Sequence, residues 1–136
     1  RTEGEPLMKT PRLTVPRHEA VTVLAQVLSE GHPLDEALRR AAPQLANASD
    51  RAWLWEVCSG VLRFKLRLDL AIDSLSLKKK PSGRIRRYLS IAAYQMIFQE
   101  SITPEKVVDE TVEAIKQKDG IPPSRFANAV LRSLLG

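Results

Sequence analysis

The sequence predicts an all-α domain, and three observations support this prediction. Apolar residues repeat with the 3.6-residue period of a helix in almost every segment, and none alternates like a half-buried strand. Proline and glycine fall between these segments, where helices begin and end. The length of 136 residues, with 43% apolar and 27% charged residues, fits one globular domain. We expect a flexible basic lead-in over residues 1–14 and a single bundle of six or seven helices over residues 15–136.

Two helices are predicted in the N-terminal part of the chain. The first covers residues near 15–30, with Pro16 in its first turn and Gly31 at its end. The second opens at Pro33, and two carboxylates in its first turn favour the helix dipole. Pro43 kinks or stops this second helix.

A third helix is predicted to start at Ser49-Asp50, which are good helix-starting residues. Gly60 lies inside its apolar stripe, where glycine costs about 1 kcal/mol of helix propensity. We interpret it as permitting either a close helix crossing or a break. The helical pattern restarts after Leu66 and ends in a turn over residues 78–83.

Three further helices complete the predicted bundle. One covers roughly residues 84–99. The next begins with Thr103 as N-cap and Pro104 at the first helical position, and it ends at Gly120. A Pro-Pro-Ser sequence then opens the closing helix.

Charge is distributed unevenly along the chain. Residues 63–88 contain nine Lys and Arg residues against two Asp residues, whereas residues 100–120 contain six acidic residues and three lysines. Opposite patches on one small domain favour two surfaces with different partners. For the acidic segment, an ordinary solvated mixture of charges is an equal alternative.

The sequence lacks the residues that covalent chemistry needs. It has no glycine-rich phosphate loop and no H-E-x-x-H motif, and its two histidines have no catalytic partners nearby. Cys58 is the single cysteine, which excludes an internal disulfide and, with only two histidines in the chain, a Cys/His zinc site. We interpret Cys58 as a small core residue. No segment is long and apolar enough for a membrane span, and no signal sequence is visible. We therefore expect a cytoplasmic binding domain without a cofactor or metal.

Asn128 is the most unusual residue of the closing helix, because its neighbours in the sequence otherwise indicate a core. A buried amide without a partner costs roughly 1–3 kcal/mol, so we expect an arranged hydrogen bond. Glu110, on the preceding helix, is the candidate partner. Both residues are predicted to have structural roles.

Four segments in order resemble the NusB/RsmB superfamily of RNA-binding domains, at residues 50–69, 87–95, 102–113 and 126–132. The strings G-V-L-R, A-Y-Q and N-A-V-L-R are most similar to the N-terminal domain of RsmB-type ribosomal RNA cytosine-5 methyltransferases. The chain departs from that family's pattern at residues 89–92 and at Asp109, where the family usually has Asn. The methyltransferase half is missing, so we favour a domain excised from a longer protein over a stand-alone relative.

Two sets of residues are predicted to bind RNA. The resemblance implies that RNA binds at the basic start of the first helix. The charge count points instead to the turn over residues 78–83 and the start of the helix that follows it. The first set is Lys9, Arg12, Arg17 and His18, and the second is Lys78, Lys79, Lys80, Arg84, Arg86 and Arg87. Arg17 and Lys79 are expected to be exposed. The two sets form one surface only if the fold brings them to the same side.

The leading functional hypothesis is an RNA-binding accessory domain that docks a cytosine-5 methyltransferase onto small-subunit ribosomal RNA. The alternative is a stand-alone transcription antitermination factor that binds RNA and a ribosomal protein. A helical protein-interaction domain without an RNA role is the third hypothesis. The expected partners are thus RNA, together with either a methyltransferase domain in cis or a ribosomal protein in trans, and no membrane.

Overall fold

The computed structural model describes residues 14–75 and 78–136, and these residues form seven α-helices and one short 3-10 helix without any strand. The elements are α1 (Thr14–Leu28), α2 (Leu34–Ala41), η2 (Ala42–Gln44), α3 (Ala48–Arg63), α4 (Lys65–Asp73), α5 (Gly83–Phe98), α6 (Pro104–Asp119) and α7 (Ile121–Leu135). The all-α prediction is therefore confirmed. In the described ranges, no helix combines the length and the apolar character that crossing a membrane requires. The expected lead-in lies almost wholly outside these ranges.

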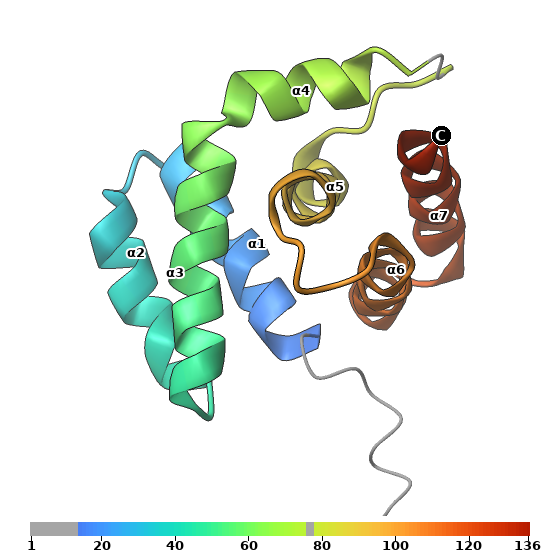
Figure 1. Ribbon diagram of the computed structural model, residues 1–136. Helices are drawn as coiled ribbons and strands as arrows, with labels where there is room; N and C mark the ends of the chain where they lie inside the picture. The colour runs from blue at the N-terminus through green and yellow to red at the C-terminus, as the bar shows by residue number, and fades with distance from the viewer. Residues whose placement is uncertain (1–13, 76–77) are drawn as a thin grey trace, which may run out of the picture.

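Helix α5 is the centre of the bundle. Figure 1 shows it end-on, with α1 and α3 on one side, α6 and α7 on the other, and α4 crossing above. All eight residues from Tyr88 to Gln95 are buried, so the helix is covered around its whole circumference. Small side chains at positions 90, 92 and 93 let its neighbours approach closely. Five other helices, α1, α3, α4, α6 and α7, enclose α5.

Two helix starts, those of α3 and α6, have a side-chain N-cap. Thr103 is the N-cap of α6, as predicted, and its hydroxyl oxygen accepts a hydrogen bond from the Lys106 N–H at 3.2 Å. Helix α3 begins slightly earlier than predicted, because Asn47 is its N-cap. The Asn47 side-chain oxygen accepts from the Asp50 N–H at 2.8 Å.

The break between α3 and α4 falls at Phe64, two residues before the expected restart. Phe64 leaves the helical conformation with φ −106° and ψ 22°. Its ring stacks on the Phe98 ring with 4.3 Å between centroids. This aromatic contact ties the break to the end of α5.

Cys58 of α3 lies in the core, where it was expected. Cys58 is fully buried, and burial raises the pKa of its thiol to about 12. A thiol with so high a pKa is not a nucleophile at neutral pH. Trp53 packs partly buried against the core, whereas Trp55 is exposed.

Gly60 permits a close helix crossing, and α3 continues through it to Arg63. A Cβ atom built on Gly60 would overlap Cε1 and Cζ of the Tyr94 ring on α5. That ring is itself buried and packs against Phe98, with 5.2 Å between their centroids. The absence of a side chain at Gly60 therefore sets the distance between α3 and α5.

Replacing Gly60 with alanine should destabilise the domain by about 1–2 kcal/mol, because displacing the Tyr94 ring outweighs the roughly 1 kcal/mol gain in helix propensity. Urea denaturation of the parent and the variant measures this difference. Ser59→Ala, at an exposed position of the same helix, is the control and should not destabilise. The double variant Gly60→Ala/Tyr94→Ala should cost less than the sum of the two single changes. Strict additivity would show that the ring does not limit the helix spacing.

Candidate nucleic-acid interface

Arg17 is buried at the junction of α1 and α6, and the prediction that it is exposed was wrong. Its side chain is 0% accessible, and its Nη2 donates a hydrogen bond to Glu110 Oε1 at 3.2 Å. The burial follows from helical spacing, because Arg17 precedes the core residues Val21 and Leu24 by four and seven positions. Arg17 therefore does not contact RNA directly.

Glu110 has the structural role that the sequence indicated, although with a different partner. Its second carboxylate oxygen, Oε2, lies 3.5 Å from Lys106 Nζ, so cations face both oxygens. Desolvation by burial lowers the pKa of the Arg17 guanidinium to about 10, and the attraction to Glu110 offsets this only in part. The Arg17 guanidinium is charged at neutral pH, and each side chain of the pair is needed to compensate the burial of the other.

Asn128 does not bond to Glu110, so that expectation was wrong as well. Asn128 is half-buried, and no hydrogen bond involves its side chain within ranges 14–75 and 78–136. The innermost positions of α7 belong to its neighbours Ala127, Val130 and Leu131. Asn128 therefore lies at the edge of the buried face of α7. The Glu110 carboxylate accepts its hydrogen bond from Arg17 of α1 instead.

His18 joins the outer side of α1 to α5 and α6. Its Nδ1 lies 2.6 Å from the Tyr88 hydroxyl, and its Nε2 lies 3.2 Å from Gln117 Oε1. Since the Gln117 oxygen can only accept, Nε2 carries the hydrogen and Nδ1 accepts from Tyr88. Burial, together with the nearby cations Lys118 and Arg17, lowers the pKa of His18. The neutral imidazole is thus the form that fits this site.

Arg86 is held by α4 and not presented to solvent. Its guanidinium donates to Asp73 Oδ1 at 2.7 Å and to Asp69 Oδ1 at 3.0 Å, and only 18% of its side chain is accessible. Two carboxylates neutralise its charge and fix α4 against α5. We therefore leave Arg86 out of the candidate interface.

The other five predicted bases of this region gather at the start of α5, and we call them the basic ridge: Lys78, Lys79, Lys80, Arg84 and Arg87. The three lysines are exposed. Arg84 pairs with Asp119, at the end of α6, and Arg87 donates to Ser29 Oγ at 2.5 Å. Among the ion pairs of the described residues, none involves the lysines or Arg87. Four cations of the ridge thus have no carboxylate partner.

The backbone at the start of α5 adds to the positive potential of the ridge. The Ser82 side chain, at the N-cap position, forms no capping hydrogen bond, and the first turn contains no acidic residue. The first N–H groups of a helix carry a partial positive charge and are a favourable site for a phosphate. Side chains and backbone therefore attract anions at the same place.

Arg87 lines two of the hollows beside the ridge. One, of about 470 Å³, lies between α5, α4 and the end of α1 and includes Lys65 and Ser82. The other, of about 270 Å³, has Thr22 and Gln26 of α1 in its wall. The fold therefore brings the outer side of α1 and the start of α5 together, which the sequence left undecided.

The remaining predicted RNA-binding residues differ in their outcome. His18 contacts Tyr88, and Tyr88 lies one helical turn after Arg84 of the ridge on α5. Lys9 and Arg12 lie outside the described residues. Sequence reasoning did not single out Tyr88 or Gln117, which position His18, and only a three-dimensional arrangement reveals them.

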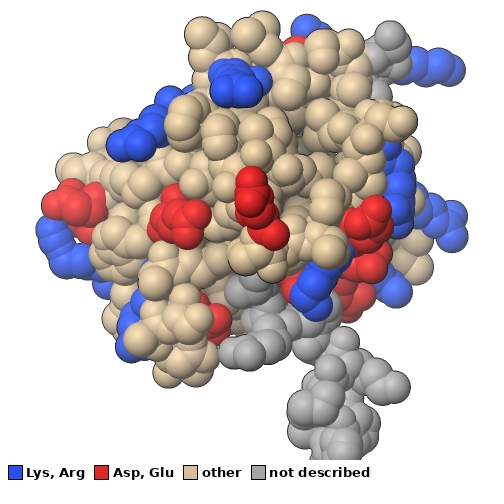
Figure 2. Space-filling model, in the orientation of Figure 1, with Lys and Arg blue, Asp and Glu red and all other residues tan. Residues whose placement is uncertain are grey.

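The face of the molecule around the far end of α5 has a different character. Figure 2 shows this face, where the acidic and basic side chains are scattered, with acidic groups over α6 and a broad uncharged area around the centre. No continuous basic patch is visible in this view. The basic ridge and this face thus belong to opposite ends of α5.

Seven helices with α5 at their centre, and cations collected at the start of α5, define a small helical binding domain. The sequence profile of the NusB family matches residues 14–135, and the chain belongs to this family. A solved structure of T. maritima NusB superimposes with a TM-score of 0.78 at 23% identity and covers 93% of this chain and 92% of that one. A complex of the antitermination factors NusB and NusE with double-stranded RNA gives a TM-score of 0.76 at 21% identity, over 89% of this chain and 93% of the matched chain.

Its sequence relatives fall into two kinds of protein. Ribosomal RNA small subunit methyltransferase B of Vibrio cholerae is 36% identical over 120 residues, which make up 86% of this chain but 27% of that protein. Transcription antitermination protein NusB of Rubrobacter xylanophilus is 31% identical over 120 residues, which make up 85% of this chain and 84% of that protein. The chain therefore spans about a quarter of the methyltransferase and most of the antitermination protein.

Removing one member of the buried pair should be far more harmful than removing both. Arg17→Met leaves the Glu110 carboxylate buried without its main cation and should cost about 3–5 kcal/mol, and Glu110→Gln alone should also destabilise because it leaves the Arg17 charge uncompensated. The double variant Arg17→Met/Glu110→Gln, which has no buried charge, should recover most of this loss. Chemical denaturation of the single and double variants measures the coupling. A double variant as unstable as the sum of its parts would show that the two groups act independently.

His18 should make the stability of the domain fall as the pH falls. Its pKa in the folded state lies below the ordinary value of 6.5, so below about pH 6.5 the unfolded chain binds more protons than the folded one. The parent should therefore lose stability between about pH 7 and pH 5 more steeply than His18→Gln does. Melting temperatures across this range test the difference. His32→Gln is the control, and a parent-like pH profile for His18→Gln would contradict the assignment.

Proposed function

We propose that this domain binds RNA through the basic ridge and serves as the N-terminal substrate-docking domain of a small-subunit ribosomal RNA cytosine-5 methyltransferase. The observation that carries the RNA part is the group of four unpaired cations around an uncapped helix start. Cations without carboxylate partners are free to replace the counterions of a phosphate backbone. Such contacts position an RNA without reading its sequence.

The geometry of the ridge suits single-stranded or irregular RNA. Arg84 and Arg87 stand on the first two turns of α5, the lysines precede them, and a hollow lies on either side. A backbone that follows the ridge places a phosphate at the helix start and its neighbouring nucleotides in the hollows. Thr22 and Gln26 of α1 then provide polar groups along the second hollow.

The methyltransferase context is supported by the relatives and by sequence detail. The chain matches a segment of about a quarter of ribosomal RNA small subunit methyltransferase B from Vibrio cholerae. The strings G-V-L-R, A-Y-Q and N-A-V-L-R fall in α3, α5 and α7, respectively. In this proposal the catalytic chemistry belongs to another domain, and this one supplies binding energy and orientation to the substrate.

The second candidate function is that of a stand-alone antitermination factor. It is favoured by the Rubrobacter xylanophilus protein, since the aligned region makes up 84% of that NusB. It also agrees with the solved complex of NusB and NusE with double-stranded RNA, and the acidic side chains over α6 suit a basic protein partner. The gene discriminates the two candidates, because a reading frame that continues into a methyltransferase supports the first and a stop codon after Gly136 supports the second.

The domain should bind a small-subunit ribosomal RNA fragment with a strong dependence on salt. Four to six neutralised phosphates predict a slope of log affinity against log salt of roughly −3 to −5. The triple variant Lys78→Gln/Lys79→Gln/Lys80→Gln should bind more weakly and reduce the magnitude of the slope by about 2–3. Fluorescence anisotropy at four salt concentrations measures both quantities.

A matched control separates the ridge from general charge. Arg39→Gln/Arg40→Gln removes two exposed cations from α2, where they pair with Asp35 and Glu36. This variant should retain the parent slope. Equal losses in the ridge and α2 variants, or no binding by the parent at low salt, would refute the proposed interface.

A further inference from the structure

A further hollow lies at the end of α5 opposite to the basic ridge. It has a volume of about 260 Å³ and lies between α3, the end of α5 and the connection to α6. Its main lining residues are Trp53, Glu56, Gln95, Gln99, Ser101 and Ile102. Helix α5 has 16 residues and is therefore about 24 Å long, so the hollow and the ridge are separate sites.

Two side chains of this hollow contain buried polar atoms without a hydrogen-bond partner. They are Trp53 Nε1, which can only donate, and Gln95 Oε1, which can only accept. The Gln95 side chain is fully buried, and its Nε2 donates to Gln99 Oε1 at 3.1 Å. Unsatisfied buried groups are uncommon in folded proteins and indicate a missing partner.

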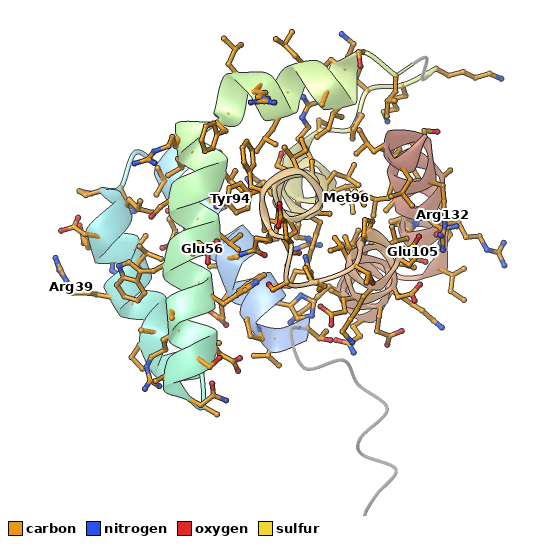
Figure 3. The ribbon with its side chains drawn as sticks, viewed as in Figure 1. Arg39, Glu56, Tyr94, Met96, Glu105 and Arg132 are labelled. Carbon is orange, nitrogen blue, oxygen red and sulfur yellow. The ribbon has the colours of Figure 1, made fainter. Side chains whose placement is uncertain are left out.

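The rim of the hollow carries a carboxylate that is fixed in place but has no cation. Glu56 Oε2 accepts from Gln99 Nε2 at 2.9 Å and from the Tyr94 hydroxyl at 3.5 Å. Figure 3 shows Glu56 on α3 on the side that faces Tyr94 of α5. Glu56 takes no part in an ion pair with any described residue. Its other oxygen, Oε1, is thus an oriented acceptor without a donor.

We propose that this hollow binds an arginine side chain of a protein partner. The guanidinium would donate to Glu56 and to Gln95 Oε1, and the methylene stem would pack on Trp53 and Ile102. Arginine fits better than lysine because its planar head has several donors in fixed directions, which match acceptors on two different helices.

The surroundings favour a protein over a nucleic acid at this site. In Figure 2, acidic groups stand isolated in a largely uncharged surface on this face. A phosphate backbone would be repelled by Glu56, whereas a basic side chain would be attracted. This inference goes beyond the proposed RNA contact and does not depend on it.

The two tryptophan indoles provide a direct test. The probe is N-acetyl-arginine N-methylamide, titrated into the ¹⁵N-labelled domain at millimolar concentrations. The Trp53 indole N–H signal should shift saturably, with a dissociation constant of roughly 1–10 mM for so small a ligand. The signal of Trp55, exposed and outside the hollow, should stay unchanged and serves as internal reference.

Glu56→Gln should weaken this binding by about tenfold or more, because it replaces a charged hydrogen bond by a neutral one. Glu105→Gln, which removes an exposed acid from the start of α6, is the control for net charge and should bind like the parent. N-acetyl-glutamine N-methylamide should not bind. Binding of the glutamine analogue equal to that of arginine, or no Trp53 shift with arginine, would overturn the proposal. A Trp53 shift caused by an RNA oligonucleotide but not by arginine would also overturn it.

Discussion

The buried ion pair between Arg17 and Glu110 is the constraint on which the arrangement of this domain depends. It fixes the rotation of α1 about its axis and its position along α6, because both charges must find each other inside the core. With Arg17 turned inward, the next residue, His18, is directed towards Tyr88 and Gln117. The polar outer side of α1 consequently lies beside the start of α5, where the basic ridge is located.

Helix α5 connects two sites of opposite chemistry. Its start carries exposed cations and unpaired backbone N–H groups, which suit an anionic polymer. Its end approaches Glu56 and contains Gln95, which together offer acceptors to a cation. The enclosed middle of the helix holds the two sites at a fixed distance. The two proposed sites would place an RNA and a protein partner at opposite ends of α5, which agrees with either proposed function.

Much of the fold could be predicted from the sequence, because local signals decide it. Thr103 announces a helix start, because N-capping acts over a few residues. For Gly60 the sequence left a close crossing and a break as alternatives, because its contact with Tyr94 joins two helices that are distant in the sequence. The site was harder to predict. Arg17 was interpreted as exposed from its charge, although its spacing to the core residues of α1 indicated burial. The partner of Glu110 was misassigned because hydrogen bonds between distant helices depend on the rotation of each helix, and Asn128 lies at the edge of the buried face of α7.

The central claim is that RNA contacts the side of the domain formed by the start of α5 and the outer side of α1. The most direct measurement is a titration of the ¹⁵N-labelled domain with a single-stranded oligonucleotide from small-subunit ribosomal RNA, followed by backbone amide shifts. We expect the largest shifts in residues 78–90 and in the exposed positions of α1, with little change in α2 and in the first half of α3. Shifts concentrated on α2 or on the acidic side of α6 would contradict the account.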